Sequence, residues 1–334
     1  MAFQVDSTLH RRRYDALRNA VDARLHSLAR ESGSGEVANA CRFALSMKGK
    51  RVRPVLLLLS CQAVGGRISR AMDAAAAVET MHNFTLVHDD IMDNADSRRG
   101  RPTVHKEWDH NTALLAGDIL LGTAYRSLLK TKTRSGAILA QLFTHGLLEV
   151  CEGQAMDIEF ERQSNVRLRK YFDMIEKKTA RLLSLSAELG GLIGNGTPRQ
   201  VRALKLFGHY LGRAFQVQDD LLDVVADQKA FGKTIGGDIR EGKKTFLLIH
   251  AYNHARGKER DLLDAVMKQQ HDKRSGTLVR RVTEFYLATG AIASARTHVS
   301  RDTRKAIASL KHLPASGARS TLEWFANTLL GRNA

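Results

Sequence analysis

Proline and cysteine are scarce in this sequence of 334 residues, with four and three copies respectively. Because proline interrupts helices, its scarcity permits long uninterrupted ones. The cysteines Cys41, Cys61 and Cys151 form no CxxC pair, which indicates neither a disulfide framework nor a zinc site. The longest aliphatic run, PVLLLLS from Pro54, is far shorter than the roughly 20 apolar residues of a membrane span, and the N-terminus lacks a signal-peptide core. We therefore expect a cytoplasmic protein without a transmembrane segment.

The charge is strongly one-sided, because 52 Lys and Arg residues against 35 Asp and Glu residues give a net charge of +17. Such an excess is typical of nucleic-acid binders, of proteins that visit anionic membranes and of enzymes with polyanionic substrates. The basic residues are scattered, in short clusters such as HRRRY and KTKTR, and no nucleic-acid-binding motif accompanies them. We expect no nucleic-acid partner.

Apolar residues recur at i, i+3 and i+4 in Ala- and Leu-rich segments, separated by short Gly, Ser or Asn turns. This pattern predicts an all-α protein, and no Val/Ile alternation supports a sheet. No composition shift or Pro/Ser-rich linker divides the chain, so we expect a single domain over residues 1–334. The predicted helices cover residues 8–30, 36–48, 52–64, 69–93, 110–130, 135–159, 168–194 and 199–226, with several more to residue 331.

The stretch VHDDIMD places Asp89 and Asp93 one helical turn apart, with Asp90 beside them. Two carboxylates about 6 Å apart repel by roughly 3 kcal/mol at an effective dielectric constant of about 20, and a bound divalent cation removes that repulsion. Mg²⁺ prefers oxygen ligands and completes its shell with waters and phosphates. A solvated acidic helix end is the alternative for this cluster taken alone.

A second cluster with the same spacing occurs about 130 residues later in FQVQDDLLD, at Asp219, Asp220 and Asp223, which weakens that alternative. The GKT at Gly232 that follows is not the end of a P-loop, because Asp227 stands where the first P-loop glycine is required and a helix precedes it. Basic residues suited to diphosphate lie near both clusters, namely Lys50, Arg51, Arg53, Arg98, Arg99, Lys233, Lys243 and Lys244.

Taken together, these motifs resemble those of the trans-isoprenyl diphosphate synthases. KGKRVRP, VHDDIMD, RRGRPTVH, KKTARL, FQVQDDLLD and GKTIGGDIREGKKT occur in that family's order over roughly residues 40–250, in a form similar to its geranylgeranyl/farnesyl branch. The resemblance implies a bundle of long antiparallel helices around a central cavity and a homodimer. Departures from the family pattern are Lys48 for a glycine, Thr234 for a proline and Gly237 for a lysine.

The resemblance also assigns roles to single residues. It implies that Lys50, Arg53, His82 and Arg99, with Arg51 beside them, bind isopentenyl diphosphate. For the allylic diphosphate it implies Arg98, Lys178, Thr179, Gln216, Lys233 and Lys243, with Lys178 also counted as catalytic. It also implies a cluster of about three magnesium ions, for which Mn²⁺ can substitute. The implied ligands are Asp89, Asp93 and Asp219, and the implied catalytic neighbours are Asp90, Asp220 and Asp223. His82 also fits the description of a polar core residue.

The implied reaction condenses isopentenyl diphosphate with an allylic diphosphate, which is dimethylallyl, geranyl or farnesyl diphosphate. Met81, Phe84 and Thr85 would limit product length, and one aromatic beside a small residue resembles C20 producers, so geranylgeranyl diphosphate is the expected product. Farnesyl (C15) and longer (C25 or above) products remain alternatives, and Phe84 also fits an ordinary core position. The two full aspartate clusters argue against a terpene cyclase. They also argue against a noncatalytic partner subunit, because such subunits often lose one of the clusters.

Overall fold

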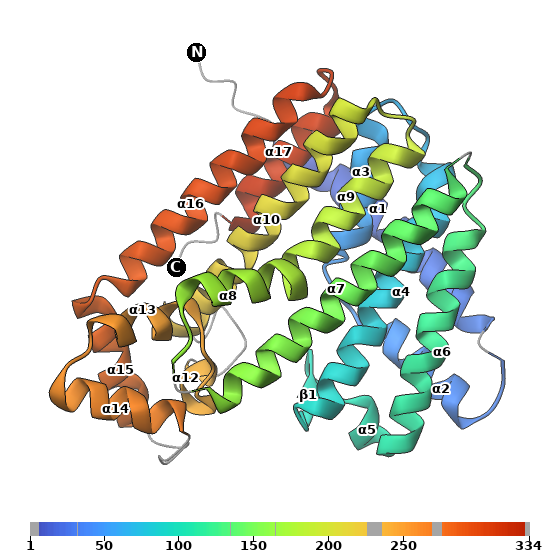
Figure 1. Cartoon of the computed structure of the whole chain (residues 1–334). Helices are drawn as coiled ribbons and strands as arrows, with labels where there is room; N and C mark the ends of the chain where they lie inside the picture. Colours follow the sequence, from blue (N-terminus) through green and yellow to red (C-terminus); the bar gives the residue numbers. More distant parts are fainter. Residues whose placement is uncertain are drawn as a thin grey trace. The chain divides into compact units, whose positions relative to one another are not determined.

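The computed structural model describes residues 7–31, 33–133, 135–163, 165–225, 236–268 and 276–330 (Figure 1). The all-α prediction is confirmed. The first helices are α1 (Ser7–Arg30), α2 (Glu36–Ser46), α3 (Val52–Ala63), α4 (Ile68–Met92), α5 (Val104–Glu107), α6 (His110–Leu129) and α7 (Gly136–Arg162). They are followed by α8 (Leu168–Ile175), the π turn η1 (Glu176–Ala180), α9 (Arg181–Ile193), α10 (Pro198–Val225), α12 (Gly237–Glu241), α13 (Phe246–His254), α14 (Gly257–Met267), α15 (Gly276–Ala288), α16 (Ala291–Ser309), the 3₁₀ turn η2 (Leu310–His312) and α17 (Gly317–Leu330).

The chain divides into two compact units, each made of three separate segments. The first unit contains Met1–Leu147, Leu185–Lys205 and Leu310–Trp324, and the second contains Leu148–Ser184, Leu206–Ser309 and Phe325–Ala334. Neither unit is a continuous stretch of sequence, so no linker could have marked a boundary between them. The single domain expected from the sequence stays a prediction.

The core of the first unit lies around α3 and α4. The run from Val55 to Leu59 is fully buried on α3, as are Ala74 to Ala77 on α4. A helix that is apolar all round is stable only when neighbours cover every side, and α4 packs against α1, α2, α3 and most extensively α6, which runs beside it in Figure 1. The C-terminal end of this covered helix carries the first aspartate cluster.

A two-stranded hairpin follows α4 and corrects the expectation that nothing supports a sheet. Strands β1 (Ser97–Arg98) and β2 (Arg101–Pro102) pair antiparallel, with Arg98 opposite Arg101. The two turn residues Arg99 and Gly100 both have positive φ, 55° and 76°, as a two-residue hairpin turn of type I′ requires. This turn could not be predicted from the residues, because arginine seldom adopts a positive φ.

The second unit is built around α13, which packs against α16, α8, α15 and α14. Tyr171, Phe246 and Tyr286 are fully buried in it. The single helix predicted over residues 168–194 is interrupted by the π turn η1, which adds a residue to one turn and redirects the side chains of Lys178 and Thr179. Within the described part of the chain, no helix is both long and apolar enough to cross a membrane.

Candidate active site

The last turns of α4 present the first aspartate cluster. Asp89 and Asp93 are one turn apart, and the Asp93 amide donates to the Asp89 carbonyl at 2.9 Å. Asp93 is exposed and Asp89 is half-buried, whereas Asp90 is buried. The Asp93 carboxylate, and in part that of Asp89, is therefore accessible to solvent, whereas that of Asp90 is not.

The hairpin directs Arg98 back onto this cluster. Arg98 binds Asp90 through Nε at 2.8 Å and through Nη2 at 2.7 Å, and Nη2 lies 3.7 Å from Asp89. Burial raises the pKa of Asp90, while the hydrogen bonds and charge of Arg98 act against that rise. The side chain of Arg98 is therefore held at the acidic end of α4, where a metal-bound diphosphate would need a cation.

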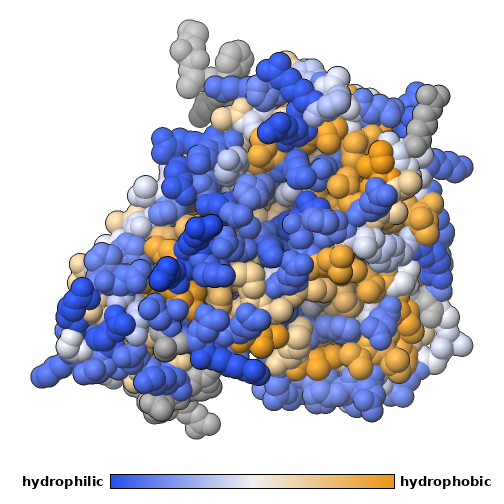
Figure 2. Space-filling model, viewed as in Figure 1, coloured by the Kyte–Doolittle hydropathy of each residue, from blue (hydrophilic) through white to orange (hydrophobic). Residues whose placement is uncertain are grey.

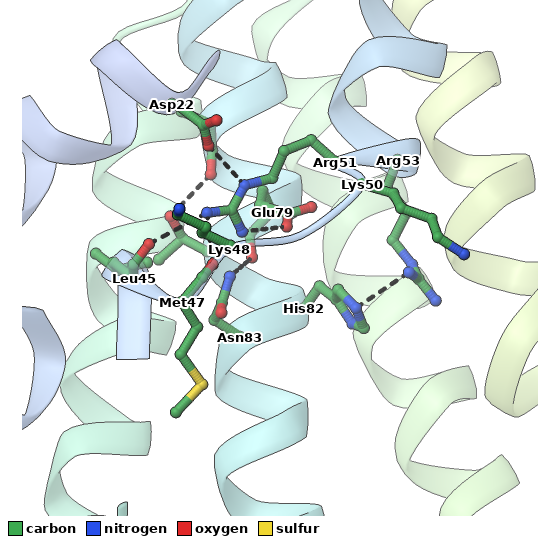
Figure 3. Close-up of polar contacts among 12 residues, drawn as sticks. Asp22, Leu45, Met47, Lys48, Lys50, Arg51, Arg53, Glu79, His82 and Asn83 are labelled. Carbon is green, nitrogen blue, oxygen red and sulfur yellow. Dashed lines mark hydrogen bonds and ion pairs between the residues drawn. The ribbon is translucent and has the colours of Figure 1, made fainter. Parts of the chain in front are cut away.

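A group of basic residues lies farther up α4, around the loop between α2 and α3 (Figure 3). Arg53 donates from Nη1 to His82 Nε2 at 3.0 Å, and Arg99 donates to the Lys48 carbonyl at 3.0 Å. Burial lowers the pKa of Arg53 to about 10, with the charge of Glu79 acting against this shift and the charge of Arg99 adding to it. Burial, then the charge of Arg53, holds the pKa of His82 well below its usual value, so the imidazole is neutral and accepts the hydrogen bond.

This group has an excess of positive charge. The Nε of Arg53 is buried without a hydrogen-bond partner, and Lys50 is exposed on the same side in Figure 3. Cations that repel one another and carry an unsatisfied donor are stabilised by an anion. Arg51, grouped with them by the sequence prediction, points away from them toward Asp22 and Glu79.

The second aspartate cluster lies on α10, in the second unit. Asp219 is exposed, Asp223 is half-buried and Asp220 is buried. Asp220 accepts hydrogen bonds from the Tyr171 hydroxyl at 2.6 Å, the Gln216 amide at 3.0 Å and the Phe246 backbone amide at 3.0 Å. Burial raises the pKa of Asp220 to about 6, against the effect of these donors. As in the first cluster, the middle aspartate is enclosed.

Asp238 on α12 joins this cluster and was not among the predicted site residues. Its backbone amide donates to Asp223 at 3.0 Å, and burial followed by the charge of Asp223 raises its pKa well above the usual value. Lys243 lies 3.9 Å from Asp238 and 2.9 Å from Glu241. In the sequence, Asp238 follows two glycines in GKTIGGDIREGKKT, between Asp223 and Lys243, and this position could have indicated that it belongs to the site.

The π turn positions two further predicted residues. Lys178 donates to Asp157 on α7 at 2.5 Å, and Thr179 donates to Gln216 at 2.8 Å, which in turn donates to Asp220. The structure thus joins the predicted residues Thr179, Gln216 and Asp220 in one hydrogen-bonded chain. Tyr171 and Asp157 are partners that the sequence motifs did not predict.

Other predicted positions are placed differently. Lys244 is buried and donates to the carbonyls of Glu161 and Met267, so its side chain serves the fold of the second unit. Lys233, with the rest of residues 227–235, lies outside the described residues. In the first unit, Met81 and Phe84 are buried. Thr85 is half-buried, and its hydroxyl donates to the His82 carbonyl at 2.8 Å.

The carboxylates fit magnesium in an open site rather than a closed one. Among the described residues, no three His, Cys, Asp or Glu side chains converge into a complete ligand set. Mg²⁺ usually takes one or two carboxylates and fills its remaining positions with water and substrate phosphate. Exposed Asp93, half-buried Asp89 one turn before it, and exposed Asp219 match that requirement.

The polyprenyl synthetase family model matches residues 35–284. The chain belongs to the polyprenyl synthetase family. It is 37% identical over 294 residues to a short chain isoprenyl diphosphate synthase of Methanothermobacter thermautotrophicus, covering 88% of this chain and 89% of that protein. It is 39% identical over 290 residues to a geranylgeranyl diphosphate synthase of Saccharolobus solfataricus, covering 85% and 86%. Among solved structures, a geranylgeranyl pyrophosphate synthetase from Pyrococcus horikoshii superposes with a TM-score of 0.90 at 35% identity, covering 98% of this chain and 99% of that one.

The resemblance found in the sequence is thereby confirmed, and so is the isoprenoid synthase fold. As a polyprenyl synthetase family member, the chain is a trans-prenyltransferase that acts on isoprenoid diphosphates, and enzymes of this family use a divalent metal. The roles of individual residues, the product length and the oligomeric state remain predictions.

Proposed function

We propose that this family member condenses isopentenyl diphosphate with allylic diphosphates to make geranylgeranyl diphosphate. The observation that carries the proposal is the excess of cations around Arg53, His82 and Arg99, where Arg53 Nε has no hydrogen-bond partner. An anion would stabilise this group of cations. The group belongs to the same compact unit as the carboxylates Asp89 and Asp93. One diphosphate held by these cations and a second held through metal at the carboxylates satisfy both.

Each group of residues has a role in the proposed reaction. Lys50, Arg53 and Arg99 hold the diphosphate of isopentenyl diphosphate, with neutral His82 orienting Arg53. The allylic diphosphate is held by Arg98, Lys178, Thr179, Gln216, Lys233 and Lys243. Asp89, Asp93 and Asp219 would hold magnesium, which would neutralise charge that develops on the leaving diphosphate.

The bond changes balance without a nucleophilic side chain. The allylic C–O bond breaks, and its electron pair leaves on the diphosphate. The double bond of isopentenyl diphosphate then attacks the allylic carbon, and a proton lost to the released diphosphate restores an allylic product. Apolar surroundings keep water from the carbocation.

A turnover assay tests this function. Isopentenyl diphosphate is incubated with dimethylallyl, geranyl or farnesyl diphosphate, and the products are separated by chromatography. We expect geranylgeranyl diphosphate with Mg²⁺ or Mn²⁺ and no turnover in EDTA. Turnover that persists in EDTA would contradict the metal assignment, and a cyclised hydrocarbon product would indicate a terpene cyclase instead.

Product length is proposed to depend on Phe84 and Thr85. Phe84 stands five residues before Asp89, about 7.5 Å along the helix axis. It is buried and packs edge-on against His88, with ring centroids 4.8 Å apart. If this ring closes the far end of the hydrocarbon site, Phe84→Ala deepens the site and gives longer products. Thr85→Phe fills the site and gives shorter products. Thr85→Ser, which keeps the hydroxyl without adding bulk, serves as the control. Unchanged product lengths in folded, active Phe84→Ala and Thr85→Phe variants would place the floor elsewhere.

We also propose that the chain forms a homodimer through α6. Leu114, Leu115 and Ile119 are 50%, 51% and 40% exposed along one face of this helix. Figure 2 shows hydrophobic residues gathered over the side of the first unit where α6 runs. A contiguous exposed apolar stripe is typical of a protein interface.

A further inference from the structure

The loop between α2 and α3 holds its central residue in an unusual backbone conformation. Arg51, which precedes α3, has φ 51° and ψ 39°, the left-handed region that residues with a Cβ seldom adopt. The Arg51 carbonyl nevertheless accepts the first helical hydrogen bond, from Val55 at 3.1 Å. A strained residue persists only where its surroundings fix it, so the contacts of Arg51 show what fixes this loop.

The guanidinium of Arg51 fixes the loop to three helices of the first unit (Figure 3). Its Nε donates to Asp22 on α1 at 2.7 Å, and its Nη1 donates to Glu79 on α4 at 2.9 Å. Its Nη2 donates to the carbonyls of Leu45 and Met47, at 3.3 and 2.8 Å, at the end of α2. Four directed bonds from one planar group use the geometry of arginine, which lysine cannot reproduce.

The ion pair with Glu79 is enclosed. The side chains of Arg51 and Glu79 are each 3% exposed. Arg51 is therefore inaccessible to a diphosphate, although the neighbouring basic residues are suited to one. A buried charge pair with four of the five guanidinium N–H groups hydrogen-bonded adds little stability but fixes the local geometry.

The basic residues on either side of Arg51 point away from it. In Figure 3 the side chains of Lys50 and Arg53 extend toward the side of His82, opposite to the direction of Arg51. The left-handed turn at Arg51 sets this division, because a change of φ and ψ there rotates Lys50 relative to the first turn of α3, which carries Arg53. Other carbonyls of the loop are also tied down: Tyr14 donates to that of Lys50 and Arg99 to that of Lys48.

We propose that Arg51 is a positioning residue for isopentenyl diphosphate. Its bonds to Asp22, Glu79 and the end of α2 hold the left-handed turn that directs Lys50 and Arg53 at one diphosphate. The inference rests on the proposed function for the identity of that substrate. It gives Arg51 a role different from that of its two basic neighbours, which touch the ligand themselves.

The test compares Arg51→Lys with a matched ion-pair variant. Arg24 on α1 binds Asp73 on α4 at 2.9 Å, so Arg24→Gln breaks a bridge between the same two helices without touching the loop. For Arg51→Lys we expect the KM for isopentenyl diphosphate to rise about tenfold or more, while the KM for the allylic primer changes less than about twofold. Arg24→Gln is expected to leave both KM values unchanged.

A double-variant comparison separates positioning from simple stabilisation. If Arg51 acts through Arg53, then Arg51→Lys combined with Arg53→Ala raises the KM for isopentenyl diphosphate little beyond Arg53→Ala alone. Tyr14→Phe, which removes the hydroxyl that donates to the Lys50 carbonyl, is expected to give a smaller rise of the same kind. Tyr14→Phe therefore tests the positioning role of the loop even if the Arg51 variant does not fold.

Calorimetric binding of inorganic diphosphate distinguishes failure of this inference from failure of the proposed function. If the wild type binds diphosphate but forms no prenyl product, weaker binding by Arg51→Lys or Tyr14→Phe still supports a positioned anion site. Equal changes in both KM values, additive effects with Arg53→Ala, or a lowered melting temperature with unchanged diphosphate binding would show that Arg51 serves the fold alone.

Discussion

The middle aspartate of each cluster is buried and accepts short hydrogen bonds. Asp90 is bound by Arg98, and Asp220 by Tyr171, Gln216 and the Phe246 amide. A carboxylate whose oxygens already accept two or three hydrogen bonds has little capacity left for a metal ion. The repeated DDxxD motif therefore combines solvent-facing carboxylates with one that orders its surroundings.

This division predicts different consequences for neighbouring aspartates. We expect Asp219→Ala to lower kcat about 10³-fold or more with little change in melting temperature, because Asp219 is exposed and acts on transition-state charge. We expect Asp220→Ala to lower the unfolding free energy by about 1–3 kcal/mol, because it leaves the Tyr171 hydroxyl and Phe246 amide buried without an acceptor. Steady-state kinetics and thermal melts check both. A stable Asp220→Ala together with an unstable Asp219→Ala would reverse the assignment.

The sequence predicted the residues that recur in short motifs and missed those that act as their partners. Asp89 and Asp219 were found because spacing alone puts them on a helix face. Tyr171, Asp157 and Asp238 were missed because each meets its partner from another element, and only packing brings them together. The burial of Arg51 was also unpredictable, since its partner Glu79 is 28 residues away.

At the scale of elements, the two local irregularities both carry predicted substrate residues. The hairpin turn holds Arg99, and the π turn holds Lys178 and Thr179. Apolar periodicity placed the long helices within a few residues of their observed ends. It could not reveal either irregularity, because a π turn keeps the sequence pattern of a helix and the hairpin has only two residues in each strand.

The π turn is packed closely against α7 at Gly153. A Cβ added there would lie 2.3 Å from the Lys178 backbone nitrogen and 2.7 Å from its Cα. We expect Gly153→Ala to destabilise the protein by about 1–3 kcal/mol, because backbone must move to admit the methyl group. Gly136→Ala on the same helix meets nothing within 4 Å and is expected to change stability by less than about 1 kcal/mol. Urea unfolding measures both, and equal effects would argue against close packing of the π turn.

A histidine on α13 makes the second unit sensitive to acid. His250 stacks on His254 of the same helix, with centroids 4.7 Å apart, and its Nδ1 is buried without a partner. Burial, then the charges of His254 and of His298 on α16, lowers the pKa of His250. The unfolded chain therefore binds the proton more readily, so this contribution to stability is present above the unfolded pKa of about 6.5 and is lost as the pH falls below it.

We accordingly expect His250→Gln to reduce the loss of melting temperature between about pH 7.5 and pH 5.5. His26→Gln, at an exposed position on α1, provides the control and is expected to leave the pH profile unchanged. Circular dichroism melts across this range are sufficient. Parallel pH profiles for wild type and His250→Gln would show that other groups cause the acid sensitivity.

At the scale of the whole molecule, scarce prolines and apolar periodicity were enough to predict the fold class. They were not enough to predict the two compact units, because each gathers segments that lie far apart in the chain. Long-range packing of this kind depends on which apolar faces meet, and helical periodicity indicates only that such faces exist. The cations proposed to bind diphosphates contribute part of the net charge of +17.

Self-association is the prediction that belongs to this scale. Leu115 and Ile119 lie one turn apart on α6, both exposed, and a second copy that covers them would bury an apolar stripe. We expect the wild type to sediment as a dimer and Leu115→Glu combined with Ile119→Glu to sediment as a monomer, because two carboxylates would have to lose water at the interface. Leu287→Glu on α15, which changes an equally exposed but separate leucine, should remain dimeric. A wild type that sediments as a monomer, or a double variant that remains dimeric, would exclude this face as the contact between copies.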